Sequence, residues 1–324
     1  MPMPDSDVRL HLGLVAAIAV VAAAALARLY SSARGTTLLA VWMWSLIAML
    51  VVVGTEMAIL TGIVNGGGEG IAAIRFAAAA ATFCPIVALL GAKRPQDRAW
   101  QLIVSSFWVI LALPAAQALL LRPGQAFVVH PIWSWFLVVL IVVGASNYLP
   151  TRNAIAALLA AAGQAVLVWH ELPWGSGPVQ NAANDWMPIV GAALLAAAVG
   201  IAALTWLRRS RREAASHVAL ERLWSDFCDQ FGVVWGLRVA ERVNVAAAQN
   251  HWNVRLAWHG VTRDHVLPLT PNPSPTKGRG KPPVAAPPSP SAAEIENLQQ
   301  SLLPLVRRFV SKEWIDRRLG EKPS

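Results

Sequence analysis

The chain has 324 residues, of which 56% are hydrophobic and 14% are charged, and its formal net charge is +9. A soluble domain carries about 25% charged residues, so this composition excludes an ordinary soluble globular protein and favours a membrane protein. The positive charge lies mainly in residues 207–324, with eighteen Lys/Arg against eleven Asp/Glu, which indicates an anionic membrane surface nearby and gives no reason to expect nucleic-acid binding.

Seven apolar stretches fill the first 206 residues, and each is close to the roughly 20 residues that a helix needs to cross a bilayer. They cover residues 10–29, 38–60, 71–90, 99–121, 131–149, 154–169 and 187–206, the sixth being the shortest. The sequence therefore predicts an all-α membrane protein in which residues 1–206 form a seven-helix transmembrane bundle. Pro85 and Pro114 are expected to kink the third and fourth spans.

Lys and Arg concentrate in one set of the loops between these stretches. Ten of them follow the first, third, fifth and seventh spans, whereas only Arg9 and Arg122 lie on the alternate side. Because cytoplasmic loops carry an excess of Lys and Arg, the sequence predicts an outward N-terminus and a cytoplasmic C-terminus. The expected location is a bacterial cytoplasmic (inner) membrane, with the tail in the cytoplasm.

Two charged residues, Glu56 and Arg75, fall clearly inside the apolar stretches. Each lies about four residues from the outer end of its span, or roughly 6 Å deep, so the two can meet. A lone charge in hydrocarbon is costly, so we expect an intramembrane ion pair. Such a pair either clamps two helices together or forms a polar site for a proton, an ion or a quinone headgroup.

Three histidines, His11, His130 and His170, fall at the outer ends of spans, near several tryptophans. Imidazoles from different helices can ligate haem iron or copper, so these residues are candidates for binding a cofactor. A histidine at a water interface is also explained without any ligand. Apart from this speculative site, no cofactor is predicted.

The tail after residue 206 divides into three parts. Residues 207–267 are predicted to be mainly helical, with helices at 213–230 and 233–250 and a short strand at 254–258. Residues 268–291 form a proline-rich linker that is expected to be disordered. Residues 292–324 form a basic amphipathic helix, whose apolar side packs either on the other tail helices or on the membrane surface.

Common membrane-enzyme motifs do not occur in the sequence: no lysine lies in a span, and there is no His-Glu-x-x-His motif or Gly-rich phosphate loop. The segment GAKRPQDRAW at residues 91–100, preceded by Phe83-Cys84-Pro85, resembles a segment of bacterial multi-pass membrane proteins. That resemblance implies an inner-membrane location and no particular activity.

Two classes of function fit these features. The first is a non-enzymatic assembly, anchoring or partner-binding component, which sits in the lipid bilayer and contacts other membrane or cytoplasmic proteins through its tail. The alternative is an outer-facing protein that handles haem, a metal or a quinone. A small-solute carrier is less favoured, because the spans show no internal repeat.

Overall fold

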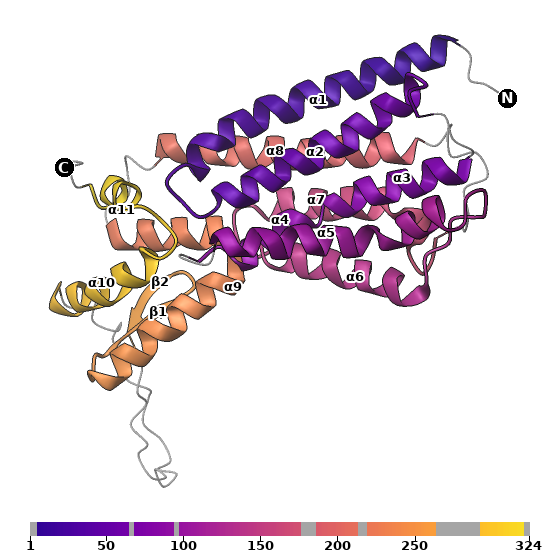
Figure 1. Ribbon diagram of the computed structural model, residues 1–324. Coiled ribbons are helices and arrows are strands. Elements are labelled where there is room, and N and C mark those ends of the chain that lie inside the picture. The colour runs from indigo at the N-terminus through magenta and orange to yellow at the C-terminus, as the bar shows by residue number, and fades with distance from the viewer. Residues whose placement is uncertain are drawn as a thin grey trace, which may run out of the picture.

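The computed structural model describes residues 5–64, 68–93, 97–175, 186–212, 219–263 and 292–320 (Figure 1). These residues are mostly helical, and five helical stretches among them are long and apolar enough to cross a membrane. The five are Val8–Ala33, Leu39–Leu60, Gly68–Leu90, Ala99–Leu120 and Met187–Arg208. Two further apolar helices have only 16 and 14 residues. The chain is therefore mostly helical, and length and composition make these five helices candidates for crossing a membrane.

Long helices packed side by side form the bundle, and the tail lies against one end of it (Figure 1). The bundle elements are α1 (Asp5–Ala33), α2 (Leu39–Leu60), α3 (Gly68–Ala81), α4 (Cys84–Leu90), α5 (Asp97–Leu120), α6 (Pro131–Ser146), α7 (Ala154–Leu167), the short 3-10 helix η1 (Trp169–Glu171) and α8 (Met187–Arg212). Large apolar side chains on the outside of the bundle remain exposed, including Leu102, Leu120 and Ile132. An apolar exterior of this kind suits contact with lipid chains.

The closest helix packing in the bundle is between α7 and α8. A Cβ atom at Gly163 would lie 3.0 Å from the Gly191 carbonyl oxygen, and one at Gly191 would lie 2.6 Å from the Leu167 side chain. The two glycines therefore allow the helix backbones to approach more closely than larger residues would, as small residues commonly do between membrane helices.

The third apolar stretch, expected to be one kinked span, is divided at Thr82 and Phe83 into α3 and α4. The Thr82 hydroxyl donates to the Ala79 carbonyl oxygen, and the fully buried Phe83 fills the break. Pro85 lies in the first turn of α4, where its missing N–H costs little. Pro114, by contrast, lies inside α5, which continues through it.

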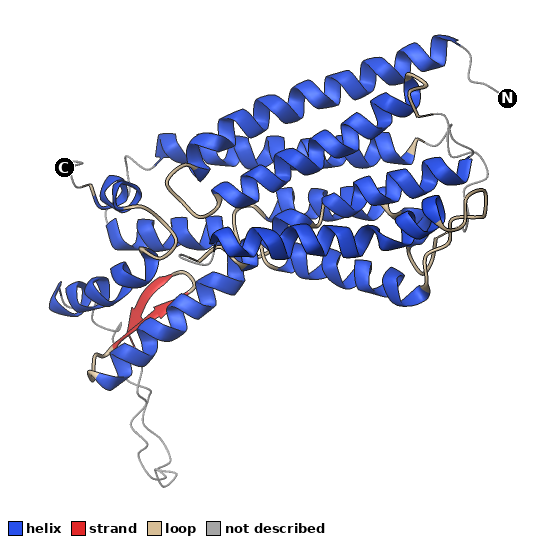
Figure 2. Cartoon of the chain, viewed as in Figure 1, coloured by secondary structure: helices blue, strands red, loops and turns tan. Residues whose placement is uncertain are grey.

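The tail domain, residues 219–320 as far as the structure describes them, is built around α9 (Ala219–Gln249). The two helices predicted in this region meet at a kink within α9, where the single non-helical residue is Gly232 (φ 74°, ψ −171°). After α9, β1 (Val254–Ala257) pairs with β2 (Gly260–Arg263) in an antiparallel hairpin (Figure 2). The first strand was predicted from the sequence; the second was not.

The C-terminal part of the tail contains α10 (Ala292–Val306) and α11 (Lys312–Leu319), so the predicted continuous helix is interrupted at residues 307–311. Both helices bury their apolar sides against α9. The core that they share contains Trp224, Phe227, Phe231, Leu298, Leu302, Phe309 and Trp314. Of the two arrangements open from the sequence, the structure therefore shows packing within the tail. The proline-rich residues 268–291 lie outside the described part of the chain.

Candidate functional site at the junction of bundle and tail

Two bundle loops hold the tail domain. The first, residues 34–38 between α1 and α2, pairs with the segment between α10 and α11. Thr36 and Val310 form an antiparallel bridge, flanked by hydrogen bonds from Thr37 N to Phe309 O (2.8 Å) and from Ser311 N to Gly35 O (2.7 Å). Backbone groups that are buried need such partners, so this short pairing fixes the C-terminal segment to the bundle.

The second loop, residues 147–153 between α6 and α7, meets the kink in α9. Val233 N donates to the Asn147 carbonyl oxygen (2.9 Å), and Val234 N donates to Asn147 Oδ1 (3.0 Å). Asn147 therefore caps the second half of α9, whose first N–H groups have no partner within that half. Gly232 makes the approach possible, because its φ is positive and a Cβ there would overlap the Asn147 side chain.

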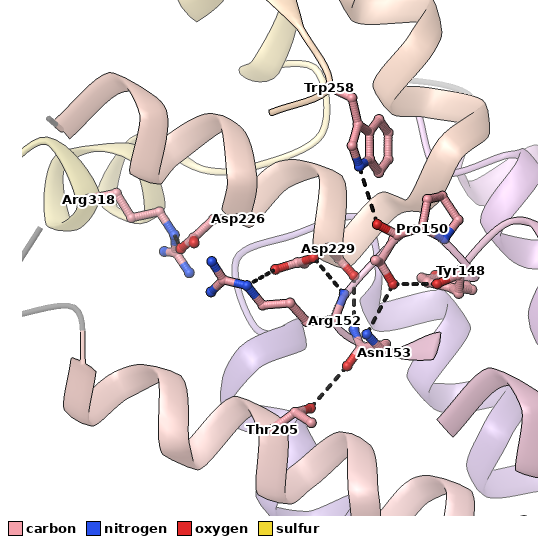
Figure 3. Close-up of polar contacts among 10 residues, drawn as sticks. Tyr148, Pro150, Arg152, Asn153, Thr205, Asp226, Asp229, Trp258 and Arg318 are labelled. Atoms are coloured by element: carbon pink, nitrogen blue, oxygen red, sulfur yellow. Dashed lines mark hydrogen bonds and ion pairs between the residues drawn. The ribbon is translucent and has the colours of Figure 1, made fainter. Parts of the chain in front are cut away.

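A polar cluster surrounds this contact (Figure 3). Asp229 Oδ1 accepts a hydrogen bond from the Arg152 backbone N–H (3.1 Å), and the Arg152 guanidinium lies 3.6 Å from Asp229 Oδ2. Asn153 donates to the Asp229 carbonyl oxygen (3.0 Å) and accepts from the Thr205 hydroxyl on α8 (3.0 Å). Asn153 thus joins α7, α8 and α9 through one side chain.

Two aromatic side chains extend the junction. Tyr148 donates its hydroxyl proton to the Gln230 carbonyl oxygen (3.1 Å), and Trp235 Nε1 donates to the Leu89 carbonyl oxygen at the end of α4 (2.9 Å). Trp258 lies in the turn of the hairpin, and its Nε1 donates to the Pro150 carbonyl oxygen (3.3 Å; Figure 3). The tail therefore contacts the bundle through α9, the hairpin and the segment after α10.

A buried ion pair joins α9 to α11 inside the tail domain. Arg318 on α11 forms a 2.6 Å ion pair with Asp226 on α9, and its guanidinium lies 3.6 Å from the centre of the Trp314 ring. The neighbouring thiol of Cys228 is also buried. Burial raises the pKa of Cys228 above its ordinary value, and the negative charge of Asp229 raises it further. This thiol is therefore protonated and unreactive at neutral pH.

Glu56 and Arg75, the pair expected from the sequence, meet at the opposite end of the bundle. Arg75 Nε lies 2.8 Å from Glu56 Oε1, and Arg75 Nη2 lies 2.6 Å from Glu56 Oε2. The side chains are only 10% and 3% exposed. This bidentate geometry joins α2 to α3 and is well suited to a helix clamp.

The three histidines proposed as cofactor ligands make separate local contacts. The His11 ring packs against Trp186 with ring centres 3.8 Å apart and planes tilted by 45°, and His130 accepts a hydrogen bond from Ile132 N at the start of α6. His170 lies in η1. Among the described residues, no three His, Cys, Asp or Glu side chains lie close enough together to hold a metal ion. A haem or metal role for these histidines stays a prediction.

The junction was not predicted from the sequence. Asn147 fell within the fifth apolar stretch, residues 131–149, and Gly232 was visible only as a residue between the two predicted tail helices, with no sign of what would contact it. Asn147 and Val234 are 87 positions apart, so their contact leaves no local pattern. The role of the junction is structural: it holds the tail domain in one orientation on the bundle.

No family model, curated protein or solved structure matches this chain.

Proposed function

We propose that this chain is a non-enzymatic assembly component of a bacterial cytoplasmic membrane. In this proposal the bundle is the anchor, and the tail domain is the part that binds another protein. The observation that carries the proposal is the docking of the tail, which contacts the bundle through loops 34–38 and 147–153 and through the end of α4. A tail tethered only by a flexible segment would need none of these contacts.

Fixed docking is useful to a binding protein because it reduces the entropy lost on association. A surface that is already oriented loses less freedom when a partner arrives, so more of the contact energy appears as affinity. Here the orientation is fixed relative to the membrane, which favours a partner that is also at the membrane surface.

We further propose seven crossings, with a cytoplasmic tail. Helices α6 and α7 are short, roughly 24 and 21 Å at 1.5 Å per residue, so they need local thinning of the bilayer or help from their flanking residues. Support comes from loops 34–38, 91–93 and 147–153, which meet the tail or one another at one end of the bundle. Because these loops lie at the same end of the bundle, the chain must cross the membrane an even number of times between one loop and the next. The same loops belong to the Lys/Arg-rich set.

The surface proposed for the partner is the groove between the second half of α9 and the hairpin, with a volume of about 920 Å³. Leu237 and Val245 line the groove and are 55% and 52% exposed. Trp252 and Trp258 line it as well. Exposed aliphatic side chains beside tryptophan are typical of the centre of a protein interface. Charged residues such as Glu241 would form part of the polar rim.

A photo-crosslinking experiment in living cells tests the proposal. A photoreactive residue placed at Leu237 should give a discrete adduct with another protein, because this position lies in the proposed interface. Gln300, an exposed position on α10, is the matched control and should give none. The assembly proposal is overturned if correctly inserted protein gives no adduct at Leu237, or equal nonspecific labelling at both positions.

A further inference from the structure

Basic side chains from the bundle and from the tail gather at the first loop of the junction. Arg34 lies directly before Gly35, whose carbonyl oxygen accepts the hydrogen bond from Ser311 N (2.7 Å). On the tail side of the same pairing, Arg307 and Arg308 lie in the segment between α10 and α11. All three arginines are exposed. The pairing therefore holds positive charge from both parts of the molecule beside one seam.

A second bundle loop adds Lys93 to this group. It follows Ala92, whose carbonyl oxygen accepts a hydrogen bond from the Thr37 hydroxyl (2.5 Å). Thr37 N in turn donates to the Phe309 carbonyl oxygen (2.8 Å), so Lys93 lies near the same pairing. Three segments that are far apart in the sequence thus supply what we call the seam patch, which consists of Arg34, Lys93, Arg307 and Arg308.

The charge of the seam patch is not neutralised within the described part of the chain. None of its four side chains forms an ion pair with a described carboxylate. The next charged residues after the patch, Lys312 and Glu313, have opposite signs and do not change the sum. Positive groups that are held near one another repel and attract a counter-ion, so the patch favours an anion placed among them.

The level of the seam patch along the bundle indicates which anion is available. Arg34 N donates to the Tyr30 carbonyl oxygen (2.9 Å), and the spanning candidate that contains Tyr30 ends at Ala33. Tyr30 is 42% exposed and packs on Trp42 of α2, with ring centres 5.1 Å apart. Tyrosine and tryptophan are enriched at the level of the lipid headgroups. The patch, one helical turn beyond Tyr30, therefore lies at the level of the headgroup phosphates.

We propose that an anionic phospholipid binds across the seam patch, with its headgroup between the basic residues of the bundle and the arginines of the tail. Guanidinium groups suit this contact because they can donate two hydrogen bonds to one phosphate. Since the lipid contacts both parts, it binds the docked tail more tightly than an undocked one and so stabilises docking. No residue of the seam patch lines the groove proposed for the protein partner, so the two sites are separate.

Amide hydrogen exchange in nanodiscs tests the proposal. Full-length protein is placed in phosphatidylcholine alone or in phosphatidylcholine mixed with phosphatidylglycerol, and exchange is followed in peptides containing Thr37 and Ser311. Their N–H groups bond across the seam, so their exchange reports undocking. The mixture should slow exchange by at least about five-fold, the value of one basic residue at an anionic surface. Equal exchange in both nanodiscs overturns the proposal. Both leaflets contain the anionic lipid, so the result does not depend on the orientation of the chain.

Substitutions on the exposed tail side locate the effect. Arg307→Gln with Arg308→Gln should lose most of the response to phosphatidylglycerol, whereas Arg307→Lys with Arg308→Lys should keep most of it, because the charge is retained. The matched control is Arg242→Gln with Arg255→Gln, which removes two exposed arginines elsewhere on the tail and should respond like wild type. A full response in the first variant, or an equal loss in the control, contradicts binding at the seam patch.

Inorganic phosphate distinguishes a lipid headgroup from a soluble anion. Phosphate added to nanodiscs of phosphatidylcholine alone should leave the exchange of Ser311 unchanged. Slowing equal to that produced by phosphatidylglycerol would assign the patch to a soluble anion and overturn the lipid. Added sodium chloride should weaken the response to phosphatidylglycerol, because salt screens exposed charges. A response that is insensitive to salt would contradict an electrostatic contact with the headgroup.

Discussion

The ion pair between Glu56 and Arg75 allows a quantitative prediction. Two short contacts, 2.8 and 2.6 Å, join the side chains in a site that is almost inaccessible to solvent. Removing one partner of such a pair leaves an uncompensated buried charge, which costs about 3 to 5 kcal/mol. We therefore expect Glu56→Gln or Arg75→Gln alone to lower the melting temperature by roughly 6 to 10 °C, at roughly 2 °C per kcal/mol.

The double substitution should recover much of that loss, because both charges are then absent. A double-mutant cycle should give a coupling energy of about 2 to 3 kcal/mol. Leu50→Gln is the control: Leu50 is 63% exposed on α2, so this change adds a polar group without stranding a charge.

The assay uses two reporters that the chain already contains. Cys84 and Cys228 are both buried thiols, 0% and 3% exposed, so a thiol-reactive fluorescent dye labels them as the protein unfolds in detergent. Purely additive losses in the two single variants would refute the reasoning, because residues that form a bidentate pair must be energetically coupled.

Four further outcomes concern the junction and the neighbouring Cys228 thiol. Asn147→Ala removes the Oδ1 cap of α9 and should destabilise the docked tail by about 1 kcal/mol, measured as faster amide hydrogen exchange in residues 233–236. Gly232→Ala should have a larger effect in the same measurement, because alanine is strained at φ +74° and its Cβ would overlap Asn147. In native protein at pH 8, Cys228 should resist iodoacetamide, since its raised pKa keeps it protonated. The same shift stabilises the fold below pH 9, the ordinary thiol pKa, and this contribution should be lost as pH rises further, measurable as a falling melting temperature.

Local sequence patterns were enough to predict the helical class of the fold and the contact between Glu56 and Arg75. Length and composition single out five helices that could cross a membrane, because the bilayer imposes both on any helix that crosses it. The Glu56–Arg75 contact followed from counting residues inward from one loop, a calculation that works for neighbouring antiparallel helices. In the tail, the β1 strand and the apolar sides of the helices could also be read from periodicity.

Features that depend on distant contacts could not be read in this way. Asn147 caps the second half of α9, and residues 35–37 pair with the segment that interrupts the predicted C-terminal helix between α10 and α11. Such contacts arise from the assembled fold and leave no periodic pattern in a single sequence.

Docking of the tail on the bundle is the central claim, and an engineered disulfide tests it most directly. Thr36 and Val310 face each other as a non-hydrogen-bonded antiparallel pair, whose typical Cα separation of about 4.5 Å permits a disulfide. Thr36→Cys with Val310→Cys is oxidised in native membranes, and a protease site inserted between residues 268 and 291 is then cut. On a denaturing gel, which removes non-covalent contacts, we predict that the C-terminal fragment stays attached until reductant is added, while Thr36→Cys with Gln300→Cys releases it without reductant. Release of the fragment from both variants without reductant would contradict the docked arrangement.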